Sequence, residues 1–138
     1  MDNIYFKKLE DLKLMYVKAA SFPEGIKEAW DKLEQSLKTF KGRKVYGTSQ
    51  CIKTEMDYRA CVVQLDGDEP EKLGLETFTI PVSDYAAKKL MNWQTQLQLI
   101  PEIFNELSSK HEIRKNVPFL EYYKSEQELI LMVPIKSN

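Results

Sequence analysis

A helical pattern flanked by strand patterns occurs twice in this chain, and this repetition constrains the fold more than any single motif. In the first half, apolar residues recur at helical spacing as Ile26, Ala29, Trp30, Leu33, Leu37 and Phe40. In the second half, the same spacing relates Ile100, Ile103, Phe104 and Leu107. Each stripe indicates an amphipathic helix with one face in the core, and Trp30 is interpreted as a core residue.

Strand patterns surround both stripes in the same order. Residues 12–20 precede the first stripe, and residues 44–48 and 58–65 follow it. Residues 75–81, extending through 84–87, precede the second stripe, and residues 119–124 and 129–135 follow it. The first helix is expected to end near Gly42.

This order predicts the fold class and the domain organisation. We expect a single α+β domain over residues 1–138, built from a duplicated β-α-β-β module with repeats at approximately 1–66 and 72–138. The acidic segment 66–73 is interpreted as the linker between the repeats. Two such modules predict a curved antiparallel sheet with both helices on one face and a ligand groove on the other.

Composition excludes several classes of function. The 138 residues carry a net charge of −1, which argues against a dedicated nucleic-acid-binding protein. The absence of a long apolar run or a signal-peptide pattern predicts a cytoplasmic protein with no membrane partner. One histidine and two separated cysteines indicate no metal site, and the sequence has no nucleotide or other cofactor motif.

The strand at 119–123 carries the most informative candidate site. Alternation along a strand places Phe119, Glu121 and Tyr123 on one face. A carboxylate between two aromatic rings is suited to an organic cation, through charge attraction and cation–π contact. The alternative from the residues alone is an ordinary edge-strand glutamate that points into water.

The motifs together resemble the GyrI-like small-molecule-binding domain, which is also the effector-binding domain of AraC- and MerR-type multidrug regulators. The matching segments are Gly25-Ile26 with Ala29-Trp30 and Leu33, Val45-Tyr46-Gly47, Tyr58-Arg59-Ala60-Cys61, Gly74-Leu75-Glu76, Ile80-Pro81 with Tyr85-Ala86, and Pro118 with Glu121, Tyr123 and Pro134. They span nearly the whole chain. The chain departs from the family at residues 88–93, which lack the His-x-Gly element of many members. We expect a stand-alone member of the family, without a DNA-binding domain.

The resemblance implies a binding function and a set of site residues. It implies a receptor for a small hydrophobic or cationic ligand, with Glu121 at the floor of the groove. The candidate aromatic walls are Phe119, Tyr123, Tyr46, Tyr58 and Trp93. No direct nucleic-acid partner is expected.

Two other functions remain open. Some stand-alone relatives are described as hydrolases of cyclopropane-containing electrophiles, and in this reading Glu121 would be the general base and Tyr123 the proton donor. The family name also comes from an inhibitor of DNA gyrase, which implies an interaction with a protein partner. The near-neutral charge of the chain gives no support for the acidic surface that such an inhibitor would need.

Overall fold

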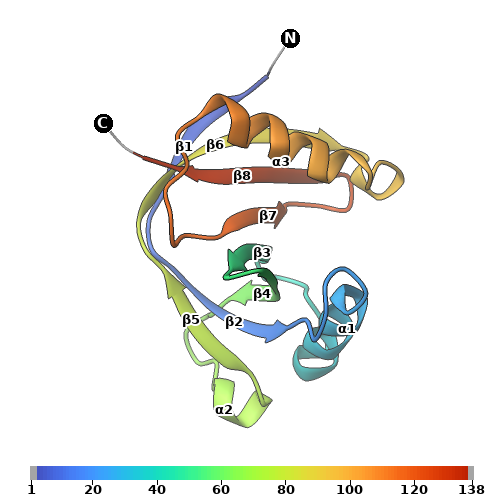
Figure 1. The fold of residues 1–138 in the computed structure, drawn as a ribbon. Coiled ribbons are helices and arrows are strands. Elements are labelled where there is room, and N and C mark those ends of the chain that lie inside the picture. Colours follow the sequence, from blue (N-terminus) through green and yellow to red (C-terminus); the bar gives the residue numbers. More distant parts are fainter. Residues whose placement is uncertain (1–2, 137–138) are drawn as a thin grey trace.

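The computed structural model describes residues 3–136, which form a curled antiparallel sheet with helices packed on it (Figure 1). The strands are β1 (Tyr5–Leu9), β2 (Leu12–Lys18), β3 (Val45–Ile52), β4 (Glu55–Val63), β5 (Glu76–Ile80), β6 (Ser83–Met91), β7 (Phe119–Tyr123) and β8 (Glu128–Ile135). The helices are α1 (Ile26–Leu37), α2 (Pro70–Leu73), α3 (Leu99–Lys110) and a 3₁₀ turn, η1 (Trp93–Thr95).

The two halves of the chain meet at the middle of the sheet. The strand order is β1-β6-β8-β7-β3-β4-β2-β5, so the central neighbours β7 and β3 come from different halves. Away from this centre, β1 pairs with β6 and β2 pairs with β5. Both pairs keep the same register, from Tyr5↔Ala87 to Tyr16↔Glu76. These bent strands carry the curl of the sheet at the left of Figure 1.

Both faces of the sheet are buried, and the helices cover only one of them. Helix α1 packs on β2 and β4, and α3 packs on β6 and β8. The opposite face carries a third apolar cluster, in which Leu120, Ile130 and Met132 are 0–5% exposed. Because both faces are buried, β8 reads as a nearly continuous apolar run rather than an alternating one.

The structure confirms the predicted fold class, an α+β fold with a curved antiparallel sheet, and both main helices lie on the same face. Some boundaries differ. Helix α1 ends at Leu37 instead of near Gly42, because Lys38 takes a positive φ of 73°, which is outside the right-handed helical region. Strand β1 was not predicted, and the short helix α2 lies inside the segment interpreted as a linker. Within residues 3–136, no helix has the length and apolar character required to cross a membrane.

Packing of the two helices on the sheet supplies much of the core. Leu33 of α1 and Leu107 of α3 are both fully buried. We expect Leu33→Ala and Leu107→Ala each to lower the free energy of unfolding by about 2–5 kcal/mol, because each leaves a cavity in a packed core. Urea denaturation would measure this loss. Lys32→Ala on the exposed side of α1 is the control, with an expected change within about 0.5 kcal/mol. Equal effects of Lys32→Ala and Leu33→Ala would contradict this packing.

Candidate functional site

The candidate site centres on the carboxylate of Glu121 in β7. Its side chain is among the few buried charged groups of the protein, with the residue only 8% exposed. The hydroxyl group of Tyr58 donates to its Oε1 atom at 2.8 Å, and the hydroxyl group of Tyr123 donates to the same atom at 2.6 Å. Within the described part of the chain, Oε2 accepts no hydrogen bond and the carboxylate has no cationic partner. Oε1 therefore has its hydrogen-bond donors, and Oε2 is available to a ligand.

Aromatic side chains from helix α1 and the turn η1 surround this carboxylate. The indole N–H of Trp30 donates to the Tyr58 hydroxyl oxygen at 3.2 Å, which extends the hydrogen-bond network into α1. The rings of Trp30 and Trp93 meet the Tyr123 ring edge-on, with centroid distances of 5.4 and 5.1 Å. Phe22 lies in the loop before α1, and its ring centroid is 6.1 Å from that of Tyr58.

Burial controls the protonation of the three groups at the centre. It raises the pKa of the Glu121 carboxyl group above its ordinary value, and the two tyrosine hydrogen bonds, which favour the charged form, offset only part of this rise. Burial and the neighbouring carboxylate also raise the pKa of Tyr58 and Tyr123. Both phenols therefore remain protonated and act as hydrogen-bond donors.

Gly47 makes room for this arrangement. It is the third residue of β3, as Glu121 is the third residue of β7, and the two are direct cross-strand partners. A Cβ atom at position 47 would lie 2.5 Å from both the Glu121 Oε1 atom and the Tyr58 hydroxyl oxygen. One half of the sheet supplies the carboxylate at this junction, and the other half supplies the space for it.

The structure brings together most, but not all, of the predicted site residues. Glu121, Tyr123 and Tyr58 are in direct contact, and Trp93 reaches them through the Tyr123 ring. Phe119 lies on the same face but packs against Phe104 of α3 at 5.4 Å.

Tyr46 does not join this group. It lies on the opposite face of the sheet, in the cluster that contains Leu120, and stacks on Tyr122 at 4.8 Å. Burial raises the pKa of Tyr46 to about 12. Tyr46 was included because its strand matched the family pattern, but alternation along β3 directs it away from Glu121.

The position of the site relative to the helices also differs from the prediction. The predicted groove lies on the face opposite to the helices, but Glu121 lies on the face that carries them, as its link to Trp30 through Tyr58 shows. The physical reason is the register of β7, because Phe119 and Tyr123 face α3 and α1 and so direct Glu121 to the same side.

Sequence reasoning missed two contributors to this site. Trp30 was interpreted as a core residue, yet it is half-buried and donates to Tyr58. Gly47 was noted only as part of a matching motif. A glycine inside a strand pattern often marks the close approach of another group, and this signal could have identified it.

The centre of the site is closed in this structure. Glu121 is buried, and three surface cavities of about 740, 930 and 380 Å³ are lined by other residues. The cleft of about 930 Å³ includes Phe22, which connects it to the Tyr58 ring. Chemically, the centre offers a desolvated carboxylate with one free oxygen, two fixed hydroxyl donors and several aromatic rings.

Comparisons with known proteins identify the fold. No family model and no curated protein sequence matches the chain. An integron cassette protein from the mobile metagenome of Vibrio cholerae has a TM-score of 0.73 and 17% identity, covering 97% of this chain and 96% of its own. SAV2435, solved with bound tetraphenylphosphonium, has a TM-score of 0.69 and 15% identity over 97% and 94% of the two chains. A hydrolase from Listeria innocua has a TM-score of 0.58 and 9% identity over 97% and 92%.

These similarities extend over essentially the full length of the chain. They show that the chain shares the fold of these proteins, and they agree with the curved antiparallel α+β sheet that the sequence predicted. The TM-scores of 0.58–0.73 show a shared fold, and a fold shared at 9–17% identity does not by itself imply a shared function.

Gly47 allows a direct test of the geometry around Glu121. Alanine normally suits a strand interior better than glycine by about 0.5–1 kcal/mol. At position 47 we expect the opposite sign, a loss of about 1–3 kcal/mol in Gly47→Ala, because the new methyl group overlaps Oε1 and the Tyr58 hydroxyl group. Urea denaturation measures the loss.

The matched background for this experiment is Glu121→Ala, which removes one of the two overlapping groups. The cost of Gly47→Ala should be smaller there, and a double-mutant cycle gives the difference. An equal cost in both backgrounds would show that Gly47 is required for a reason unrelated to the carboxylate.

Proposed function

We propose that this protein is a receptor for lipophilic organic cations, which bind between α1 and α3 against the Glu121 carboxylate. The observation that carries the proposal is a buried carboxylate with two hydroxyl donors on one oxygen and no cationic partner in residues 3–136. Buried carboxylates are normally paired with a positive charge. A cationic ligand would supply the missing charge.

The surroundings of Glu121 favour a large, poorly hydrated cation over a small one. The rings of Trp30, Tyr58, Tyr123 and Trp93 offer the negative faces that attract organic cations. They also bury apolar surface of the ligand. A metal ion or a simple ammonium ion would lose its water here without gaining enough oxygen ligands in return.

Structural similarity supports the same class of ligand. SAV2435 shares this fold and binds tetraphenylphosphonium, a lipophilic cation. The cytoplasmic location of this chain stays a prediction from the sequence.

Binding requires movement of side chains around Glu121. The residue is only 8% exposed, so a ligand of this size reaches Oε2 only when the neighbouring rings shift. Trp30 and Trp93 are both half-buried and belong to a helix and a short turn outside the sheet. Their displacement would open the site and leave the sheet intact.

Calorimetry with matched ligands tests this proposal. We expect tetraphenylphosphonium to bind better than the neutral triphenylphosphine oxide, and Glu121→Gln to remove most of this preference. A desolvated charge interaction is worth about 1–3 kcal/mol, which corresponds to roughly tenfold to hundredfold in affinity. The substitution preserves the shape of the side chain and its ability to accept both tyrosine hydrogen bonds.

Glu128→Gln is the matched control, because Glu128 lies on the neighbouring strand β8 and pairs with Lys89 and Lys124. It should leave the preference for the cation unchanged. Equal affinity of the wild-type protein for the cationic and neutral compounds would refute the proposal.

Hydrolysis of an electrophile is the second candidate function. The free Oε2 atom and the raised pKa of Glu121 suit a general base that activates water. Tyr123, 2.6 Å from the carboxylate, is placed to exchange a proton with it. The fold is shared with a hydrolase from Listeria innocua.

Turnover separates the two functions. If the protein is a receptor, we expect the ligand to saturate it stoichiometrically. We also expect no consumption of a cyclopropane-containing electrophile, measured by chromatography of substrate and product. Multiple turnovers in the wild-type protein that disappear in Glu121→Gln would refute the receptor proposal and support the hydrolase. In that case Tyr123→Phe should lower the rate by about 10²–10⁴, the range for one acid–base group.

A further inference from the structure

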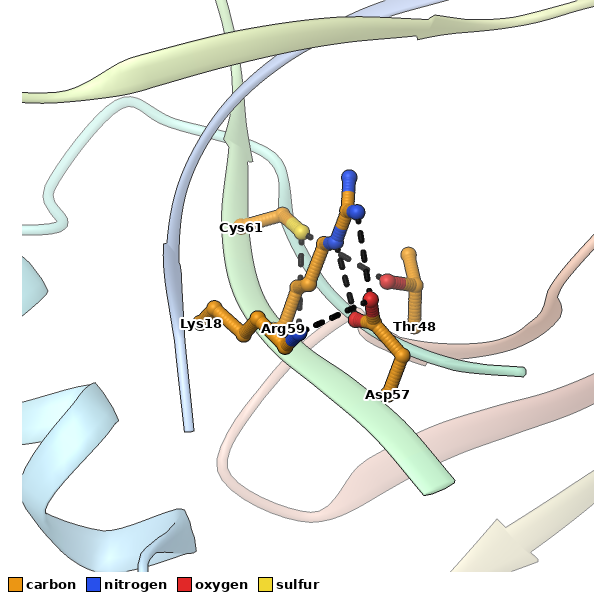
Figure 2. Close-up of polar contacts among 5 residues, drawn as sticks. All are labelled: Lys18, Thr48, Asp57, Arg59 and Cys61. Atoms are coloured by element: carbon orange, nitrogen blue, oxygen red, sulfur yellow. Dashed lines mark hydrogen bonds and ion pairs between the residues drawn. The ribbon is translucent and has the colours of Figure 1, made fainter. Parts of the chain in front are cut away.

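A second cluster of charged side chains lies on the opposite face of β4 from the Glu121 site. Tyr58 packs in the cluster that contains Ala29 and Leu33 of α1. Alternation along β4 directs its neighbours Asp57 and Arg59 to the other face, and Figure 2 shows these two side chains together with Lys18. Arg59 donates to Asp57 through Nε at 2.9 Å and through Nη2 at 3.2 Å. The Lys18 ammonium group lies 3.5 Å from the same carboxylate. Two cations thus share one carboxylate, which leaves an excess positive charge.

Aromatic rings hold the Arg59 guanidinium group in place. It lies over the ring of Tyr16 at 4.3 Å and over the ring of Phe78 at 4.6 Å. The Nη1 atom points away from Asp57 in Figure 2, and it donates no hydrogen bond within the described residues. The arginine is therefore fixed in position with one donor group unused.

A small cavity lies beside this arginine. Its volume is about 110 Å³, and it is lined in part by Thr48, Gln50, Asp57, Arg59 and Asn116. This is the space of a few water molecules, at about 30 Å³ each. The hydroxyl and amide groups of its wall can all donate hydrogen bonds. Size, excess charge and donors together match a compact anion.

We propose that this cavity is a binding site for a small oxyanion, a carboxylate or inorganic phosphate, with Arg59 as the charged anchor. The Asp57 carboxylate does not oppose such a ligand strongly, because both of its oxygens are engaged by Arg59 and Lys18. Arginine is well suited to this role, since its planar donors match the oxygens of carboxylates and phosphates. This site lies on the other face of the sheet from Glu121 and takes ligands of the opposite charge.

NMR titration at constant ionic strength tests the proposal. Isotope-labelled protein is titrated separately with sodium phosphate and with sodium acetate, while the Nε–H signal of Arg59 and the side-chain amide signals of Gln50 and Asn116 are followed. We expect saturable shifts of these signals with at least one anion. A response to phosphate alone or to acetate alone would identify the kind of oxyanion. Linear, unsaturated shifts with both would overturn the proposal.

Arg59→Lys keeps the positive charge but loses the fixed planar donors, and we expect it to weaken binding by about tenfold or more. The control is Arg43→Lys, because Arg43 also makes a two-bond pair, with Asp68, but does not line this cavity. It should leave anion affinity unchanged. If Arg59→Lys does not fold, Asn116→Ala supplies the same comparison, with loss of an amide donor and weaker binding. Unchanged affinity in the folded cavity variants would also overturn the proposal.

Discussion

Two tyrosine hydroxyl groups donate to one oxygen of a buried carboxylate at the junction of the two halves of the sheet, and the site depends on this interaction. Glu121 comes from β7, Tyr58 from β4, and Gly47 of the intervening strand β3 leaves the space between them. The helix that covers one half reaches the same point, because Trp30 donates to Tyr58. Three paired strands and the packed helix α1 must therefore be in place before the carboxylate has its hydrogen-bond partners.

This arrangement connects stability with function. Burying a carboxylate without a positive partner costs free energy, which the two hydroxyl groups offset only in part, as the raised pKa of Glu121 indicates. The sheet tolerates this cost because apolar clusters are packed on both of its faces. A ligand cation that enters the site would recover some of this free energy. The second charged cluster, around Arg59, avoids the same cost by pairing Asp57 with two cations.

Sequence patterns predicted the elements of the fold well and the details of the site only in part. Helical spacing identified both helices, and alternation identified β7 and placed Phe119, Glu121 and Tyr123 on one face. The face itself was assigned wrongly, because alternation shows which residues share a side but does not show which side the helices cover. Tyr46 was misplaced, and the role of Trp30 was missed, because an aromatic residue on an apolar helix stripe looks the same whether it fills a core or reaches a buried hydroxyl group.

Proton release on ligand binding tests most directly whether the buried carboxylate recognises the cation. In the free protein, burial raises the pKa of Glu121, and a bound cation should lower it by favouring the charged form. At a pH between the two values, titration of tetraphenylphosphonium in buffers of different ionisation enthalpy should reveal release of up to one proton per ligand. We expect this release in the wild-type protein and none in Glu121→Gln. Cation binding with no proton released at any pH across the acidic to neutral range would contradict it.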